Sequence, residues 1–172
     1  MKATGLKCEY LKNPLGIDII NPRLSWIDES VKTQTKAEVL YRINNGEEKT
    51  ITVASSNMNV KFSDKVRSRD FVTWKVRIYD ENGNAGELSE EAYFSFGLLE
   101  KADWKAKWIK GDYKVSKKKR YPVDVFYKEF NVDSIQSAFL YISALGLYEV
   151  YINEQKVSNY LLTPGSTDYR IR

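Results

Sequence analysis

Strict alternation of apolar and polar residues, in short runs, is the feature of the first hundred residues that most restricts the fold. The clearest run is DFVTWKVRIY, in which one face would carry Val72, Trp74, Val76 and Ile78 and the other Thr73, Lys75 and Arg77. Successive side chains of a β-strand point to opposite faces, so a period of two predicts a strand with one buried face. Such runs, separated by turns, favour sheets over helices.

Similar runs recur on both sides of this one, in PRLSWID, KAEVLYRI, TITVA, NVKFS and EAYFSFG. They amount to about six or seven strands in residues 1–97, which is typical of an immunoglobulin or fibronectin type III β-sandwich. Trp26 and Trp74 could stack on sugars, but a Trp on an alternating apolar face favours a core role. We therefore expect an antiparallel sandwich over residues 5–97 whose core contains Trp26, Trp74, Val76, Phe94 and Phe96. Asn45-Gly46 is expected to supply a hairpin turn with positive φ.

Composition excludes several kinds of site. The chain has no histidine, which removes His-based acid/base, nucleophilic and zinc sites. Cys8 is the single cysteine and cannot form an internal disulfide. The N-terminal residues lack the apolar core of a signal peptide and no run is long enough to span a bilayer, so we expect a cytoplasmic protein without membrane partners. We expect no cofactor and no metal site.

Residues 98–122 have the character of a linker. Trp104 and Trp108 are spaced as on one side of a helical turn, although an irregular connector is the alternative, and their indoles could pack between domains or form a ligand cage. The basic run YKVSKKKRYP follows, with Lys114, Lys117, Lys118, Lys119 and Arg120. A nucleic-acid patch would use such a run, but a solvated loop needs no partner, and we predict no nucleic-acid binding.

Residues 123–172 are expected to hold the first strands of an incomplete domain. DVFYKEFNV, SAFLYISAL and LYEVYIN are strand-like, and the faces with Leu140, Ile142, Val150 and Ile152 are apolar. Three such strands make a poor independent core, and unpaired edges are templates for association. We therefore expect these faces to be covered from outside the segment, and favour homodimerisation through the exposed strands over packing on the first domain or on a missing remainder.

Seven sequence blocks, in order, carry a resemblance to a known enzyme family. They are NPLGID (13–18), PRLSW (22–26), WKVRIYDENG (74–83), FSFGLLEKADWKAKWI (94–109), FYKEF (126–130), YISALGLYEVYINEQKV (141–157) and LTPGSTDY (162–169). Together they resemble the N-terminal region of bacterial α-L-rhamnosidases. The resemblance implies an all-β fold, with a fibronectin type III-like sandwich followed by a partial jelly-roll domain.

The resemblance also implies where the chemistry lies. These enzymes are inverting glycoside hydrolases, with an acid and a base carboxyl group roughly 6.5–9.5 Å apart. Their acidic residues belong to a helical barrel that the resemblance places beyond Arg172, so no residue here inherits a catalytic role. Asp80-Glu81 and Glu90-Glu91 are interpreted as turn and edge charges. The chain is expected to be inactive alone. Its expected partner is the remainder of a parent enzyme, and it would meet rhamnose-containing glycosides only as part of that enzyme. The alternatives are a self-sufficient carbohydrate- or protein-binding module and a structural spacer.

Two departures from the family pattern bear on the structure. ITVASSNMNVKF stands where the family usually shows Trp-Asp-Ser-Gly, so the middle of the sandwich is expected to differ. Asn153-Glu154 replaces the Asn-Gly of a tight hairpin. A non-Gly residue in a left-handed conformation costs about 1 kcal/mol, which predicts a turn longer than two residues.

Overall fold

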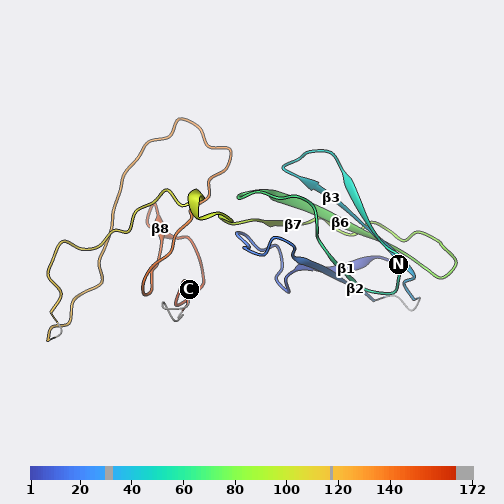
Figure 1. Cartoon of the computed structure of the whole chain (residues 1–172), viewed down its shortest axis with the longest axis horizontal. Coiled ribbons are helices and arrows are strands. Elements are labelled where there is room, and N and C mark those ends of the chain that lie inside the picture. Colours follow the sequence, from blue (N-terminus) through green and yellow to red (C-terminus); the bar gives the residue numbers. More distant parts are fainter. Residues whose placement is uncertain (30–32, 117, 166–172) are drawn as a thin grey trace. The chain divides into compact units, whose positions relative to one another are not determined.

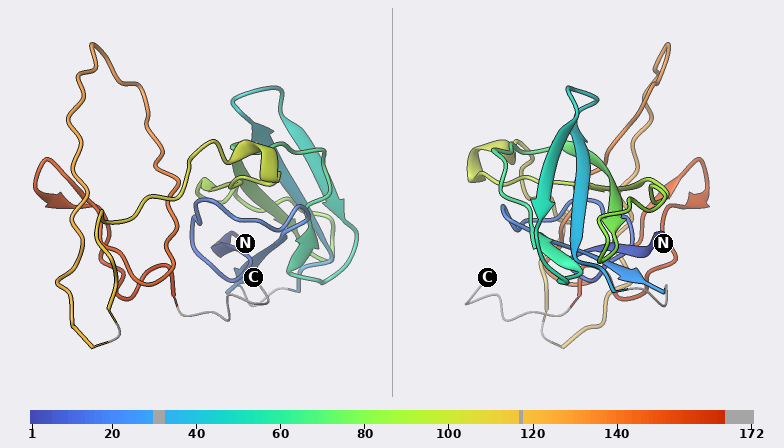
Figure 2. Two further views of the ribbon diagram at one scale, coloured as in Figure 1. Left: turned by 60° about the vertical axis from the view of Figure 1, so that its left-hand side comes forward. Right: turned by 90° about the vertical axis from the view of Figure 1, so that its right-hand side faces the viewer.

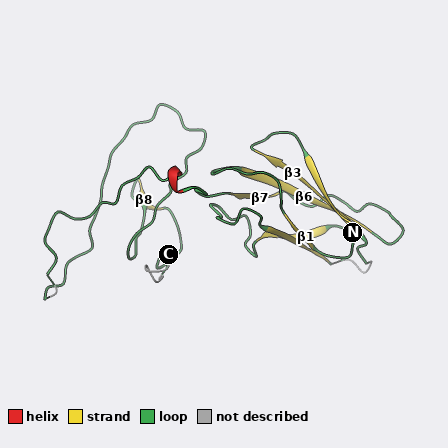
Figure 3. Cartoon of the chain, in the orientation of Figure 1, coloured by secondary structure: helices red, strands yellow, loops and turns green. Residues whose placement is uncertain are grey.

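The computed structural model describes residues 1–29, 33–116 and 118–165 (Figure 1). It divides into two compact units, Met1–Lys110 and Gly111–Arg172. Strands form the first unit, and the one helical element in the described residues is the 3₁₀ turn η1 (Lys101–Asp103), red in Figure 3. The predicted all-β fold class is confirmed. No helix in the described part of the chain is long and apolar enough to cross a membrane.

The first unit is a sandwich of two antiparallel sheets, shown from two further directions in Figure 2. One sheet has the order β1-β2-β5 and the other the order β4-β3-β6-β7. The first consists of β1 (Ala3–Cys8), β2 (Arg23–Asp28) and β5 (Asn59–Lys61), and the second of β4 (Lys49–Val53), β3 (Lys36–Ile43), β6 (Phe71–Tyr79) and β7 (Ala92–Ser95). The region ITVASSNMNVKF links the sheets, because it supplies part of β4 and all of β5.

Pairing of β3 with β6 places their apolar residues in the core. The register runs from Lys36 opposite Tyr79 to Ile43 opposite Val72. Residues opposite each other lie on the same face of a sheet, so the period-two pattern of both strands is buried together. The five predicted core residues are all buried, with exposed fractions of 3% or less: Trp26, Trp74, Val76, Phe94 and Phe96. Within this core, the ring of Phe62 packs edge-on against the ring of Tyr41 and against that of Phe94.

Gln34 is a buried polar residue that ties Trp26 to the neighbouring loop. Its Oε1 accepts a hydrogen bond from Trp26 Nε1 at 2.9 Å, and its Nε2 donates to the carbonyls of Asn57 at 2.8 Å and Ser55 at 3.3 Å. Buried polar groups are costly without such partners. The indole N–H of Trp74, in contrast, is buried with no acceptor among the described residues.

The segment Asn13–Ile17 covers the outer edge of β7. Ser95 N donates to the Pro14 carbonyl at 3.1 Å, Ile17 N to the Ser95 carbonyl at 2.9 Å, and Gly97 N to the Ile17 carbonyl at 2.8 Å. A Cβ at Gly97 would lie 2.9 Å from the Gly16 carbonyl oxygen, so the close approach requires glycine there. The NPLGID block therefore protects a strand edge that would otherwise be open to association.

The turn after β3 differs by one residue from the prediction. Asn44 and Asn45 carry the positive φ values, 51° and 58°, and Gly46 N closes the turn on the Ile43 carbonyl at 2.9 Å. Asn tolerates the left-handed region better than most residues, so the two adjacent asparagines take the central positions. The expected Asn45-Gly46 pair is therefore wrong by one position.

Of the three strands predicted in the second unit, the described residues form only part of one. Its described residues form one hairpin, β8 (Tyr151–Ile152) with β9 (Gln155–Lys156). DVFYKEFNV and SAFLYISAL form no strand, and LYEVYIN contributes only β8. Their sequence patterns suit strands, but a strand requires a hydrogen-bonded neighbour. An isolated pair of strands is only marginally stable in water. Residues 166–172, which include the last four residues of the LTPGSTDY block, lie outside the described residues.

The β8–β9 turn is shorter than predicted. Asn153 and Glu154 alone connect the strands, with φ values of 48° and 67°. Two central residues with positive φ are the hallmark of the type I′ hairpin turn. The expectation of a longer turn is wrong, because this hairpin accepts a glutamate in the left-handed region.

Candidate functional site

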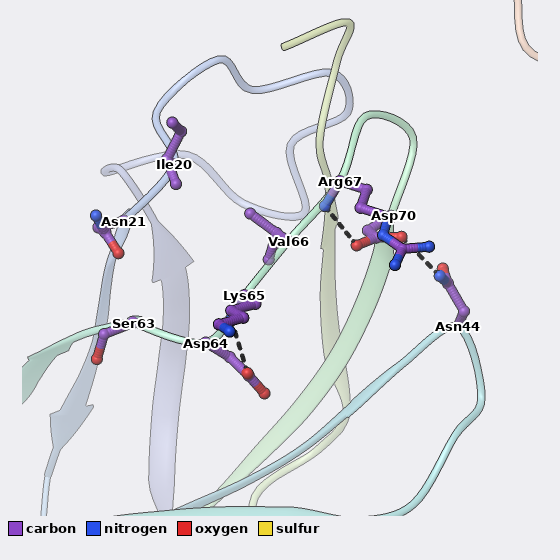
Figure 4. A pocket seen from close by; sticks show the side chains of 9 residues that line it. All are labelled: Ile20, Asn21, Asn44, Ser63, Asp64, Lys65, Val66, Arg67 and Asp70. Carbon is purple, nitrogen blue, oxygen red and sulfur yellow. Dashed lines mark hydrogen bonds between the residues drawn. The ribbon is translucent and has the colours of Figure 1, made fainter. Parts of the chain in front are cut away.

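An open depression of about 750 Å³ lies at one end of the sandwich (Figure 4). Three segments line it: Ile20–Asn21 before β2, Asn44 after β3, and the Ser63–Asp70 loop between β5 and β6, including Ser63, Asp64, Lys65, Val66, Arg67 and Asp70. They meet because two strand pairs are antiparallel. The end of β3 lies beside the start of β6, and the start of β2 lies beside the end of β5. Loops gathered at one end of a sandwich are a common place for binding sites.

Asp64 is a carboxylate with structural partners. Its Oδ2 accepts hydrogen bonds from Lys49 Nζ at 2.7 Å and Tyr41 Oη at 3.0 Å, and its Oδ1 accepts one from Lys65 N at 2.7 Å. The Lys49 ammonium, with Lys65 N and Tyr41, holds the pKa of Asp64 below its usual value. Burial, and then the hydrogen bond to Asp64, raises the pKa of Tyr41 to about 12. Asp64 is therefore held ionised, and is unsuited to donate a proton near neutral pH.

Asp70 and Asn44 join two loops into one wall. Asp70 Oδ1 accepts a hydrogen bond from Asn44 Nδ2 at 2.7 Å, and Asp70 Oδ2 accepts a hydrogen bond from Arg67 N at 2.7 Å. Asn44 Oδ1 in turn accepts from Phe71 N at 2.8 Å. Arg69, between these groups, has a φ of 72°, which a non-Gly residue adopts rarely. The Asp70 carboxylate thus maintains the turn.

The carboxylates singled out in the sequence occupy turns and a strand edge. Asp80 is 1% exposed, and its Oδ1 accepts bonds from the backbone N–H groups of Asn82 and Asn84. Glu91 pairs with Lys75 at 3.3 Å, whereas Glu81 and Glu90 are exposed. No group of three or more His, Cys, Asp or Glu residues in the described parts of the chain could hold a metal ion.

The two linker tryptophans do not share a helical turn. The chain leaves the 3₁₀ turn at Trp104, which has an extended backbone, and Trp108 follows in irregular structure. The predicted helical spacing is therefore wrong, and the irregular connector is the form observed, because the helix ends after Asp103. Trp104 is 45% exposed and Trp108 71%.

A stacked tyrosine pair lies at the base of the basic run. Tyr113 and Tyr121 have ring centroids 5.0 Å apart and nearly parallel planes. Tyr121 Oη accepts a bond from Ser116 N and donates one to the Lys114 carbonyl. The cationic residues Lys114, Lys118, Lys119 and Arg120 are exposed, and Lys117 lies outside the described residues.

The second unit contains a smaller, mainly apolar hollow of about 200 Å³ beside the β8–β9 hairpin. Its lining includes Leu140, Ile142, Val150 and Val157. Leu140 is 59% exposed, Ile142 41% and Val157 53%. Three of the four residues predicted to need covering therefore stay exposed, namely Leu140, Ile142 and Ile152, while Val150 is half-buried.

The sequence predicts no site residues, and its pattern does not identify the residues that line the depression. The available signal was the polar stretch SDKVRSRD between two strand-like runs, which is long for a sandwich connection. Polarity alone does not distinguish a binding loop from a solvated one.

Two family models match the chain in sequence order. A model described as "Rha78A-like, N-terminal immunoglobulin domain" matches residues 3–100, and one described as "Alpha-L-rhamnosidase N-terminal domain" matches residues 133–172.

Curated relatives and solved structures agree with these matches. An α-L-rhamnosidase of Alteromonas sp. (strain LOR) is 34% identical, and the match covers 99% of this chain and 21% of the relative's length. An α-L-rhamnosidase of Formosa agariphila is 31% identical, and the match covers 95% of this chain and 20% of the relative's length. The structure of an Aspergillus terreus α-L-rhamnosidase has a TM-score of 0.74 and 26% identity over 99% of this chain and 21% of its own. The structure of an α-L-rhamnosidase from Dictyoglumus thermophilum has a TM-score of 0.57 and 30% identity, and the match covers 64% of this chain and 14% of that chain. The chain thus spans about a fifth of the length of the curated relatives it matches.

Proposed function

The chain belongs to the Rha78A-like N-terminal immunoglobulin domain family of α-L-rhamnosidases, and we propose that it is a non-catalytic N-terminal region of an enzyme that releases terminal rhamnose from glycosides. One observation carries this proposal. Two N-terminal models match in order, while relatives named α-L-rhamnosidase match over nearly the whole chain but only about a fifth of their own length.

The chemistry of the described residues supports a non-catalytic role. Glycoside hydrolysis with inversion needs an acid and a base carboxyl group roughly 6.5–9.5 Å apart, with space for water between them. Asp64, Asp70 and Asp80 instead accept hydrogen bonds from neighbouring backbone and side-chain groups, and Asp64 is ionised by its pairing with Lys49. In our proposal the reacting carboxyl groups belong to another part of the enzyme.

Release of nitrophenol from nitrophenyl α-L-rhamnoside tests the proposal. The 172-residue chain should release none above background, whereas a protein that joins it to the sequence that follows in its source reading frame should do so. Hydrolysis by the 172-residue chain, lost on a single carboxylate substitution such as Asp64→Asn, would overturn the non-catalytic assignment. A longer protein that cleaves other glycosides but not rhamnosides would overturn the substrate class.

The proposed partner is the remainder of the parent enzyme. The exposed apolar residues of the second unit supply a surface that such a partner, or a second copy of the chain, would cover. Binding of rhamnose-containing glycosides through the parent enzyme belongs to the same proposal. The cytoplasmic location and the absence of nucleic-acid and membrane partners stay predictions.

A further inference from the structure

The depression at the end of the sandwich displays cations that lack partners. Asp64 is paired with Lys49, and Asp70 is satisfied by Asn44 and Arg67 N. Among the described residues, the side chains of Lys65 and Arg67 form no hydrogen bond or ion pair. Their charges therefore remain available to an anionic ligand. An arginine guanidinium matches the geometry of a carboxylate and binds it with two parallel hydrogen bonds.

The backbone that carries these two cations is held in place. Asp64 Oδ1 accepts the Lys65 N–H and Asp70 Oδ2 accepts the Arg67 N–H, each at 2.7 Å. Asn44 then joins this loop to the turn after β3. A site whose backbone is ordered before binding loses less entropy when a ligand arrives. Figure 4 shows these bonds around the rim of the depression.

The remaining lining suits a sugar ring better than a bare anion. Ile20 and Val66 are apolar and can contact the C–H face of a ring, while the amide of Asn21 and the hydroxyl of Ser63 are exposed and can bond to sugar hydroxyls. A volume of about 750 Å³ falls within the usual range for small-ligand sites.

We propose that this depression binds a carboxylate-bearing saccharide unit, with Lys65 and Arg67 recognising the carboxylate. The inference rests on the proposed function, since a saccharide is the ligand expected of a region of a glycoside hydrolase. It adds an acidic sugar to the substrate class, beyond the terminal rhamnose.

Amide chemical shifts of the 172-residue chain, titrated with glucuronate, test the proposal. Glucose and acetate, at matched ionic strength, serve as the neutral-sugar and bare-anion probes. Glucuronate should shift the amides of Asn44, Lys65 and Arg67 in a saturable way, and glucose and acetate should bind at least about tenfold more weakly. Arg67→Gln and Lys65→Gln should each weaken glucuronate binding by about tenfold, because their backbone bonds persist while the cation is lost.

Lys107→Gln is the matched control, since it removes the same charge at an exposed position outside the depression. It should leave glucuronate binding unchanged. The proposal is overturned by an absence of shifts at the lining residues, by acetate or glucose binding as well as glucuronate, or by Arg67→Gln binding like the unaltered chain. Rhamnoside hydrolysis by the longer protein is a separate readout, so a failed titration leaves the proposed function standing, and a failure of the proposed function is detected by the hydrolysis assay and not by this titration.

Discussion

Trp74 and Trp108 are the same residue type in opposite environments, with exposed fractions of 1% and 71%. Trp74→Ala should lower the free energy of unfolding of the sandwich by about 3–5 kcal/mol, because it deletes one of the two tryptophan side chains of the core. Trp108→Ala should change it by less than about 0.5 kcal/mol. Urea unfolding followed by circular dichroism measures both. Equal midpoints for Trp74→Ala and the unaltered chain would contradict the core role of Trp74.

The pKa of Asp64 makes the sandwich sensitive to acid. The folded state lowers this pKa through Lys49, so the carboxylate stabilises the fold above the pKa of the unfolded chain, about 3.9, and this contribution disappears as pH falls through the lower folded value. The pair is partly exposed, so its contribution is at most about 1 kcal/mol.

Asp64→Asn should therefore lower the melting temperature at pH 6, and the difference from the unaltered chain should shrink below about pH 4. Thermal melts at a series of pH values measure this. Glu81→Gln, at an exposed turn position, is the control and should show no such trend. A deficit of the same size at pH 3 and pH 6 would rule out the titration of Asp64 as its cause.

At the scale of elements, the β8–β9 hairpin contains a testable strain. Glu154 has a φ of 67°, and a non-Gly residue pays about 1–2 kcal/mol for a left-handed backbone. Glu154→Gly gives the Asn-Gly pair that type I′ turns prefer, and should stabilise the hairpin by about 1 kcal/mol.

Hydrogen exchange at Val157 N reports on this hairpin, because that group donates to the Val150 carbonyl at 2.9 Å. Its exchange should slow by about fivefold in Glu154→Gly, which corresponds to about 1 kcal/mol. The substitution Glu149→Gln, which changes a charge on the same hairpin without altering the turn, should not slow it. Unchanged exchange in Glu154→Gly would mean that the turn does not limit the stability of the hairpin.

The strands that could be predicted are those whose pairing partners lie within the same sandwich. In β3 and β6 the period-two pattern and the pairing agree, so the pattern alone identified the strands and the core. SAFLYISAL is apolar on both faces and was also predicted to be a strand, but it forms none in the part of the chain that the structure describes. Periodicity reports which face a strand would bury, and not whether a partner strand is present.

The polar contacts could not be predicted, because they depend on tertiary structure. Gln34 resembles a loop residue in the sequence, yet it is 1% exposed and bonded to the Trp26 indole. The depression likewise arises from three loops that are distant in sequence and meet through the pairing of β3 with β6 and of β2 with β5. Neither pattern nor composition identifies such a meeting point.

At the scale of the whole molecule, the two units differ in how they treat apolar residues. The sandwich buries its aromatic core and covers the edge of β7 with Asn13–Ile17. In the second unit Val123, Val125, Phe126, Leu140 and Ile152 are all more than half exposed. Burying one such side chain is worth roughly 1.5–3 kcal/mol, so association that covers several of them is favoured.

We therefore expect the 172-residue chain to self-associate when no other partner is present. An exposed apolar surface with open strand edges is satisfied by a second copy through a two-fold arrangement, which supplies both contacts and hydrogen bonds. Sedimentation of the chain at tens of micromolar should show dimers or larger species. The double variant Leu140→Ser, Ile142→Ser removes two exposed apolar side chains and should therefore shift the distribution towards monomer. Tyr10→Ser and Leu11→Ser, exposed on the sandwich, form the matched control and should leave it unchanged. A clean monomer that binds no hydrophobic dye would sink this prediction, because it would mean that the apolar residues of the second unit are already covered within one chain.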